Sequence, residues 1–242
     1  MRVSLFITCL VDQLWPSVGT SAVEVLRRAG CEVVFDERQT CCGQPAFNTG
    51  YRAEARRLAE RFIGIFEESG SDAVVSPSGS CTAMAHHFHA LFDRDAGWRR
   101  RAEALAARTH EFGSFLVNVL GVEDVGASFR GRVTWHDACH GLRDLNVHGE
   151  PRKLLRNVRG LEFVELANAD ACCGFGGTFS VKYPEISVAI LDQKIEAIEK
   201  AGVRAVVSGD ASCLMQIGGR LTRGGSRVRA MHLAEVLAAK ES

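Results

Sequence analysis

The chain has 242 residues, which is long enough for one large domain or for two of about 120 residues. Its 29 lysine and arginine residues balance its 29 acidic residues, so its charge gives no sign of binding to nucleic acid or to an anionic membrane. Apolar residues make up 46% of the chain, an ordinary value for a globular protein, but no apolar run approaches the ~20 residues that span a bilayer.

The first apolar run, residues 3–11, is short and lacks both a basic region and a small-residue cleavage site. We therefore interpret it as a strand and not as a signal peptide, and we expect a cytoplasmic protein. Disulfides are rare in a reducing compartment, so the 9 cysteines favour metal binding or redox chemistry.

Strands and helices alternate through the first half of the chain. Short apolar runs rich in β-branched residues are typical of buried strands, and Gly30 and Gly70 fit as the residues that end two of the helices. A loop through Pro16 follows the first strand. The expected strands are residues 2–8, 32–36 and 72–76, and the expected helices are residues 17–29, 51–69, 82–91, 95–107 and 111–120.

The second half repeats this order after a polar junction at residues 121–131. Its expected strands are residues 132–136, 161–166, 205–208 and 228–230, and its expected helices are residues 151–158, 185–201 and 231–239. Strands that alternate with helices predict parallel strands joined by crossovers. We therefore expect an α/β protein of two similar halves, residues 1–122 and 123–242, each a small parallel-sheet domain.

Eight of the 9 cysteines form two sets with nearly the same spacing. Cys41 and Cys42 stand directly before Gly43, and the same triplet recurs 131 positions later. In each set one cysteine precedes the pair by 32 or 33 positions, and one follows it by 39 or 40. An internal repeat that keeps its thiols in place is the strongest signal in the chain. The sets are Cys9, Cys41, Cys42 and Cys81, and Cys139, Cys172, Cys173 and Cys213.

Each of these cysteines follows shortly after an expected strand. Because ligands of parallel sheets collect beyond the carboxyl ends of the strands, we expect the four thiols of each half to form a metal site there. Four thiolates hold either a zinc ion or an iron–sulfur cluster. Zinc ligands usually come in pairs about two to four residues apart, whereas adjacent cysteines point apart and suit the spread irons of a cluster. Iron–sulfur is therefore favoured, with zinc and ordinary core cysteines as alternatives.

The cysteine pattern resembles the paired CCG (cysteine-rich) domains of iron–sulfur oxidoreductases. These include the B-type component of heterodisulfide reductase and the iron–sulfur subunits of glycolate oxidase and anaerobic glycerol-3-phosphate dehydrogenase. The segments at residues 77–81, 135–140 and 172–177, together with the lack of a ferredoxin-like cysteine segment, are most similar to the lactate utilization protein A family. The resemblance covers essentially the whole chain.

The resemblance implies one 4Fe–4S cluster per half, held by the eight repeated cysteines. It also implies an electron-transfer subunit for the oxidation of L-lactate to pyruvate, working with lactate utilization proteins B and C. Heterodisulfide reductase ends each repeat in Cys-x-x-Cys, but Ser78 and Asp210 replace the first of those cysteines here. The alternatives are a disulfide or quinone reductase component of that type and a zinc-stabilised interaction module.

Other candidates flank the cysteines. His136, Asp137 and His140 lie near Cys139, and they are candidates to donate hydrogen bonds to a cluster or to relay protons near a substrate. The alternative is that His136 and Asp137 simply cap the next segment. No residue is identified as a proton-abstracting catalyst, so we expect the organic substrate to bind in a partner or at an interface. We interpret the remaining candidates as a histidine-rich surface helix and a core residue, namely His86, His87 and His89, and Cys31.

Overall fold

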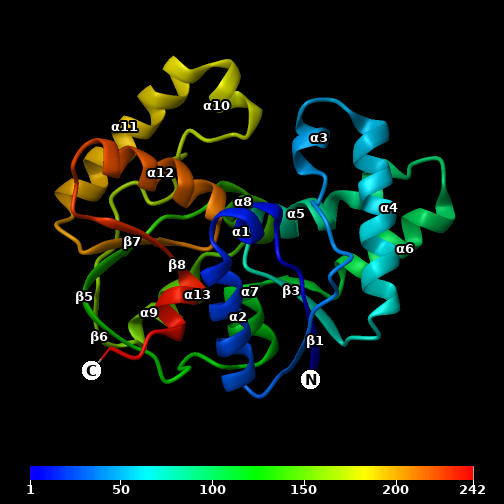
Figure 1. The fold of residues 1–242 in the computed structure, drawn as a ribbon, viewed down its shortest axis with the longest axis horizontal. Helices are drawn as coiled ribbons and strands as arrows, with labels where there is room; N and C mark the ends of the chain where they lie inside the picture. Colours follow the sequence, from blue (N-terminus) through cyan, green and yellow to red (C-terminus); the bar gives the residue numbers. More distant parts are fainter. Residues whose placement is uncertain (242) are drawn as a thin grey trace.

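Two four-stranded sheets form the framework of the protein in the computed structural model, which describes residues 1–241 (Figure 1). Both sheets are parallel throughout, with the strand orders β2-β1-β3-β4 and β6-β5-β7-β8. The strands are β1 (Arg2–Leu5), β2 (Glu32–Val34), β3 (Ala73–Ser76), β4 (Thr109–Glu111), β5 (Ser128–Trp135), β6 (Arg159–Phe163), β7 (Ala205–Ser208) and β8 (Arg229–His232). This topology confirms the predicted α/β fold of two similar halves.

The central strands of the two sheets have equivalent registers. Val3 of β1 and Val133 of β5 each pair with the first residue of the third strand in their sheet. Three residues later, Phe6 and His136 each donate a backbone N–H to that same third strand. Phe6 and His136 therefore occupy equivalent positions in the two halves.

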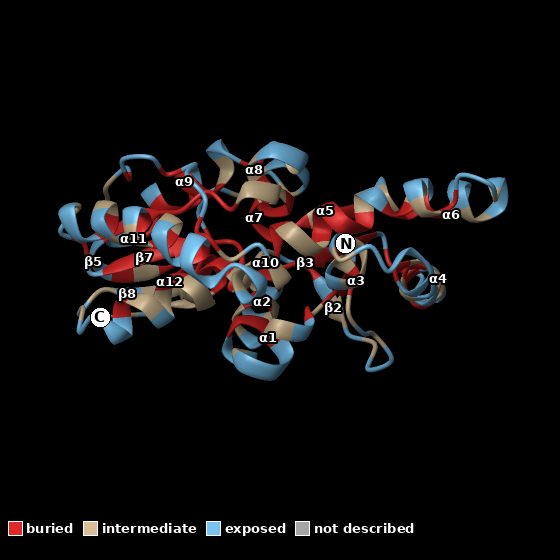
Figure 2. Ribbon diagram, turned by 90° about the horizontal axis from the view of Figure 1, so that it is seen from above, coloured by how far each residue is buried: buried red, intermediate tan, exposed pale blue. Residues whose placement is uncertain are grey.

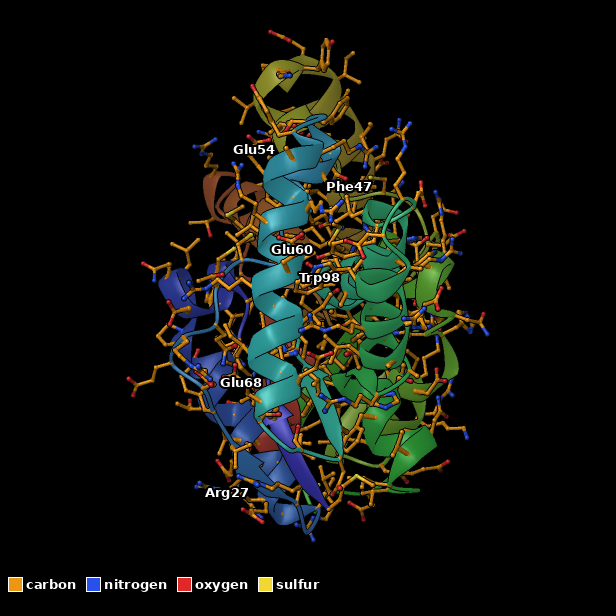
Figure 3. All side chains as sticks on the ribbon, turned by 90° about the vertical axis from the view of Figure 1, so that its right-hand side faces the viewer. Arg27, Phe47, Glu54, Glu60, Glu68 and Trp98 are labelled. Carbon is orange, nitrogen blue, oxygen red and sulfur yellow. The ribbon has the colours of Figure 1, made fainter. Side chains whose placement is uncertain are left out.

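Helices connect the strands and surround the sheets. The first half contains α1 (Cys9–Leu14), α2 (Pro16–Arg28), α3 (Gln44–Asn48), α4 (Arg52–Glu68), α5 (Gly79–His87), the 3-10 helix η1 (Phe88–Leu91), α6 (Ala96–Ala106), α7 (Phe112–Ser114) and the π-helical turn η2 (Phe115–Val119). The second half contains α8 (Cys139–Leu145), α9 (Gly149–Arg156), α10 (Thr178–Lys182), α11 (Pro184–Lys200), α12 (Ala211–Arg223) and α13 (Leu233–Ala238). Figure 3 shows α4 as the outer wall of the first half, with Glu54, Glu60 and Glu68 along it. Within residues 1–241, none of the helices combines the length and apolar character that a bilayer crossing requires.

Several elements were not predicted, most of them short, but they include the 13-residue helix α12. The expected loop before Pro16 contains α1, which begins because the Thr8 side chain accepts a hydrogen bond from the N–H of Val11. Helix α5 begins three residues before the expected start at residue 82, because Ser78 caps it. The helix expected over residues 111–120 is divided into the end of β4, α7 and η2. The short elements are shorter than the window in which apolar periodicity is visible.

The apolar core has three layers separated by the two sheets. Because successive strand residues point to opposite faces, Val75 and Val207 join a central cluster that both halves share, whereas Val74 and Val206 point into separate outer clusters. Helices α2 and α13, from opposite ends of the chain, pack together in the central cluster. Figure 2 shows buried segments running through the middle of the molecule with exposed helix surfaces around them.

Candidate metal centre

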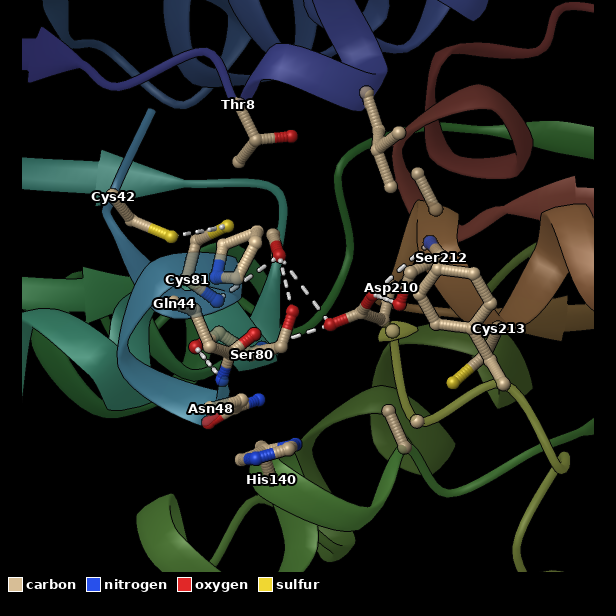
Figure 4. Close-up of a pocket in the computed structure, with 18 of the residues that line it drawn as sticks. Thr8, Cys42, Gln44, Asn48, Ser80, Cys81, His140, Asp210, Ser212 and Cys213 are labelled. Carbon is tan, nitrogen blue, oxygen red and sulfur yellow. Dashed lines mark hydrogen bonds between the residues drawn. The ribbon is translucent and has the colours of Figure 1, made fainter. Parts of the chain in front are cut away.

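All eight repeated cysteines line one cavity of about 230 Å³, to which both halves contribute. It lies beyond the carboxyl ends of the central strands, where parallel topology directs the connecting loops. Its walls come from α3 and the loop before it, from the start of α10, and from the first turns of α1, α5, α8 and α12. Figure 4 shows Cys42 and Cys81 on one side of the cavity and Cys213 on the other. The structure thus brings both predicted quartets to the same place.

The four thiols of the first half form two close pairs. Cys9 Sγ lies 3.9 Å from Cys41 Sγ, and Cys42 Sγ lies 3.3 Å from Cys81 Sγ. All four are free thiols, and they range from the exposed Cys9 to the buried Cys42. This quartet therefore extends from the surface to the outer core of its half.

The second quartet includes a histidine among its buried members. Ligand atoms of His136, Cys173 and Cys213 all lie within 4.8 Å of one another, and all three residues are buried. Cys139 Sγ lies 3.5 Å from His140 Nδ1, closer to the surface. His136 is therefore the one predicted flanking residue that lies among the buried sulfurs.

A glycine in the left-handed region follows each cysteine pair. The φ angles of Gly43 and Gly174 are 87° and 82°, values that other residues rarely adopt. Their N–H groups donate to Cys41 Sγ at 3.4 Å and to Cys172 Sγ at 3.3 Å. A Cβ atom at Gly174 would also collide with the backbone carbonyl of Ser187. Both triplets therefore need glycine for the turn, and the second also needs it for the close approach of backbone to helix α11.

Hydrogen bonds shift the pKa values of the thiols in the first quartet in opposite directions. Cys41 Sγ accepts from Cys9 and from the Gly43 N–H, and hydrogen bonding with its neighbouring thiols, first of all Cys42, lowers its pKa. The hydrogen bond from Cys9 to Cys41, together with burial, raises the pKa of Cys9. In the second half, hydrogen bonding with Cys173 and burial raise the pKa of Cys172. These hydrogen bonds therefore favour the thiolate form of Cys41, the form in which cysteine binds metals.

Ser78 and Asp210 join the two halves across the floor of the cavity. They form an antiparallel bridge, and the Asp210 carboxylate accepts from the Ser80 N–H at 2.8 Å and from the Ser78 hydroxyl at 3.3 Å (Figure 4). Ser78 also caps the N-terminus of α5, and Asp210 caps that of α12. Ser78 and Asp210, which replace a cysteine of the heterodisulfide reductase pattern, therefore cap two helices and connect the two halves.

Asp137 lies in a buried ion pair behind the second quartet. Its carboxylate accepts from Arg152 at 2.9 and 2.8 Å and from Trp135 Nε1 at 2.7 Å. Helix α8 has no side-chain hydrogen bond at its N-cap. The cap interpretation of His136 and Asp137 is therefore wrong, because the Asp137 carboxylate is committed to Arg152 and the ring nitrogens of His136 bond to nothing at that helix end.

Lys194 is a buried residue that the sequence analysis did not single out. It is only 2% exposed, and its Nζ donates to the carbonyls of Asn168 at 2.5 Å and Ala169 at 3.2 Å. The sequence does contain a signal for its burial, because Lys194 lies on the apolar face of α11 between Leu191 and Ile198. A lysine at such a position is usually a sign of a specific partner, because burial of an unpaired charge is costly.

The other histidines lie away from the cavity. His86 Nε2 is 2.8 Å from the carbonyl of Thr109, and His89 Nδ1 is 2.8 Å from the carbonyl of His86. His87 is exposed, and among residues 1–241 these histidines form no metal-binding group. Cys31 is buried in the central cluster, which confirms that it is a core residue.

The donor set suits iron–sulfur chemistry. Each half offers four free thiols and a backbone N–H that donates to sulfur, which are typical surroundings of a cluster. His136 adds a buried imidazole whose two nitrogens have no hydrogen-bond partner within the described part of the chain. Buried polar atoms normally have a partner, and a cluster sulfur would supply one here.

The cysteine arrangement matches a known family. The model of the CCG family, described as a cysteine-rich domain, matches residues 3–85 and 133–218. The chain belongs to this family. It is 51% identical to lactate utilization protein A of Bacillus subtilis over 98% of this chain and 99% of the relative. Its identity to lactate utilization protein A of an Exiguobacterium strain is also 51%, over 98% of this chain and 96% of the relative.

Similarity to solved structures is much weaker. A glutamate racemase from Bacillus anthracis is 12% identical, covers 98% of this chain and 78% of its own, and superposes with a TM-score of 0.39. A likeness of that size carries no argument about function. The full-length relatives instead confirm the resemblance of this chain to the lactate utilization protein A family.

Proposed function

We propose that this protein carries one 4Fe–4S cluster in each half and transfers electrons during the oxidation of L-lactate to pyruvate. The name of its full-length relatives supports the lactate assignment. In this proposal residues 1–122 and 123–242 are two cluster-binding units, and their ligands are the two cysteine quartets defined above. The partners are lactate utilization proteins B and C, and the compartment is the cytoplasm, where thiols remain reduced.

One observation carries the proposal: eight free thiols from two sequence repeats line a single cavity. Two ligands in each quartet are adjacent in sequence, as Cys41 and Cys42 are in the first. Neighbouring side chains point apart, which favours several irons over a single zinc ion. The N–H groups of Gly43 and Gly174 add the hydrogen bonds to sulfur that tune such clusters.

Two sites in one chain suit the electron count of the reaction. Oxidation of a 2-hydroxy acid to a 2-oxo acid releases an electron pair, and iron–sulfur clusters, when bound, carry electrons one at a time. The chain itself supplies the thiol ligands, the glycine N–H donors and the cavity walls. We assign no proton acceptor for lactate to its side chains, and we place the organic substrate in a partner or at an interface with it.

Anaerobic metal analysis tests the cluster assignment. Full loading corresponds to about eight irons per chain with matching acid-labile sulfide, and to absorbance near ~400 nm. Fewer than about two irons per chain would contradict the assignment. Zinc without that absorbance would instead support the interaction module.

A disulfide or quinone reductase is the second candidate function. It is favoured by the cavity, which both quartets line and which could admit a small substrate between the two sites. Ser78 and Asp210 count against it, because they replace one cysteine of each half of the heterodisulfide reductase pattern. An assay of thiol release from disulfides separates the two functions, since an electron-transfer subunit releases none.

A further inference from the structure

The two proposed cluster sites have equivalent thiols but different residues behind them. Phe6 and His136 are equivalent by strand register. Helices α4 and α11 present buried residues at the same spacing, which makes Phe62 equivalent to Lys194. The matching residues are Ala55, Ala59, Phe62 and Phe66 on α4, where Ile63 and Ile65 are buried as well, and Ser187, Leu191, Lys194 and Ile198 on α11.

Next to the first quartet, the two equivalent positions are occupied by the aromatic residues Phe6 and Phe62. The rings of Phe6 and Phe62 pack edge to face with centroids 4.7 Å apart, in the outer cluster that contains Cys42. Phe66 and Phe88 extend this aromatic group around Phe62. In the first half, as far as the structure describes it, the one buried charged side chain is Glu111, which ends β4 and lies against Gly209 of the other half. The half-buried Arg108 donates to the backbone carbonyl of Phe66 near the end of α4.

Behind the second quartet the equivalent pair is polar and cationic. His136 has ligand atoms within 4.8 Å of the sulfurs of Cys173 and Cys213. Lys194 is buried, and two backbone carbonyls hold its Nζ in place. Burial lowers the pKa of Lys194, while nearby Cys173, Asp170, Asp137 and Cys213 act to raise it. Anionic sulfur at this site therefore favours the charged form of the lysine.

Other charges around the quartets do not cancel this difference. Arg143 of α8 is a second cation whose charge acts on Cys139 and Cys172, and its equivalent on α1 is the neutral Gln13. Three carboxylates oppose these cations. Asp137 is paired with Arg152, and Asp170 is exposed, so water and salt screen its charge. The Asp210 carboxylate accepts hydrogen bonds from Ser78 and Ser80 of the first half. The Asp210 charge acts on Cys139 and Cys213, and at Cys139 the charge of Arg143 opposes it. Lys194 remains as the buried cation of the second site.

We infer that Lys194, with His136 as a hydrogen-bond donor to sulfur, raises the reduction potential of the second-half cluster above that of the first. Reduction adds negative charge to a cluster, and a fixed cation in a low-dielectric interior stabilises that charge. Hydrogen bonds to sulfur act in the same direction. An aromatic wall offers neither effect. This inference rests on the proposed function and makes the second half the site where an electron is held at equilibrium.

Potentiometric titration of the two sites, monitored by EPR, tests the order of potentials. The full-length protein is loaded anaerobically with iron and sulfide. Cys42→Ser is expected to retain only the second-half cluster, and Cys173→Ser only the first. The higher midpoint potential should belong to Cys42→Ser. Equal potentials, or the reverse order, would overturn the inference without any substitution of Lys194.

Substitution of Lys194 in the Cys42→Ser protein tests its role directly. Lys194→Met should lower the midpoint potential of the remaining cluster, and Lys194→Arg should leave it close to that of the Cys42→Ser protein. Lys200→Met is the matched control, because this lysine lies on the same helix with its side chain 74% exposed. An unchanged potential in Lys194→Met would overturn the role of the lysine. If that variant does not fold, His136→Phe, which copies Phe6, must lower the potential through loss of its N–H donor.

The same measurements separate this inference from the proposed function. An unsubstituted chain that binds no iron–sulfur cluster would overturn both. Two loaded clusters with one common potential would overturn only the inference.

Discussion

The two halves hold equivalent quartets of thiols, but the buried side chains next to the quartets differ. In the first half, Phe6 and Phe62 fill the space between the sheet and its long helix, and in the second half His136 and Lys194 fill it. The turns that carry the thiols depend on strand ends and on glycines with positive φ, which do not constrain these side chains. A repeated backbone therefore does not impose a repeated electrostatic environment.

The last strand of each sheet shows the same contrast. Glu111 ends β4 and His232 ends β8, and each side chain caps the helix that follows. His232 Nε2 donates to the carbonyl of Pro77 at 3.1 Å, across the seam, and the Glu111 carboxylate lies against Gly209 in the opposite half. An acid and a base thus occupy equivalent buried positions, and both contact the other half.

The largest expected effect comes from removing one quartet at a time. Cys42→Ser and Cys173→Ser should each lower the iron content to about half of its full value, because each quartet holds its own cluster. Iron analysis and absorbance near ~400 nm measure the loss. Cys31→Ala, in the core and outside both quartets, is the control and should keep all of the iron. Complete loss in both cysteine variants would mean that the halves share one centre.

The second effect concerns the buried ion pair between Asp137 and Arg152 in the second half. Arg152→Met would leave the Asp137 carboxylate buried without its cation, so we expect a loss of about 3–5 kcal/mol in the free energy of unfolding. Arg132→Met breaks an exposed pair with Glu162 and should cost no more than about 1 kcal/mol. Denaturant unfolding of both variants measures the difference, and equal losses would show that burial of the pair has no energetic role.

The third effect is a pH dependence that arises at Glu111. Burial raises its pKa from 4.5 to about 7, and the nearby Glu150 and Asp210 charges add to this shift. The folded protein therefore keeps a proton that the unfolded chain releases. The resulting stability is fully present below about pH 4.5 and is lost as the pH rises to about 7. At 1.36 kcal/mol per pKa unit, the loss is up to about 3 kcal/mol.

Glu111→Gln should abolish this slope, so that the variant exceeds the parent in stability by up to about 3 kcal/mol at about pH 8. His232 acts with the opposite sign: burial lowers its pKa, so its contribution is present above its unfolded pKa and is lost as the pH falls. Unfolding curves of parent and variant between about pH 4.5 and 8 separate the two, because His232 is common to both. An identical slope in Glu111→Gln would contradict the assignment.

The smallest expected effect is at the seam. Asp210→Ala removes a helix cap and the bonds to Ser78 and Ser80, whereas Ser78→Ala removes a cap and a single bond across the seam. We expect about 2 kcal/mol for the first and about 1 kcal/mol for the second. Thermal unfolding of the two variants side by side tests this order, and a larger loss in Ser78→Ala would reverse it.

Much of the framework could be predicted from the sequence. Apolar runs of four or more residues predicted the longer strands, and the repeated cysteines predicted that thiols such as Cys9 and Cys139 follow equivalent strands. The three-residue strand β4 and the five-residue helices α3 and α10 were missed, because a short element shows no period and forms only where its neighbours provide caps and contacts. Shortness does not explain the 13-residue helix α12, which was missed as well. The pairing of Ser78 with Asp210 was also beyond prediction, since 132 positions separate them.

By itself, the sequence determined the α/β order, the two repeats and the edge at which the thiols gather, because alternation of parallel strands and helices directs every strand end to one side. Only the tertiary structure decided that both quartets open onto one cavity and that Lys194 and Phe62 occupy equivalent places behind them. The physical reason is that local patterns fix the direction of the backbone, whereas the charge near a thiol depends on side chains that arrive from distant helices.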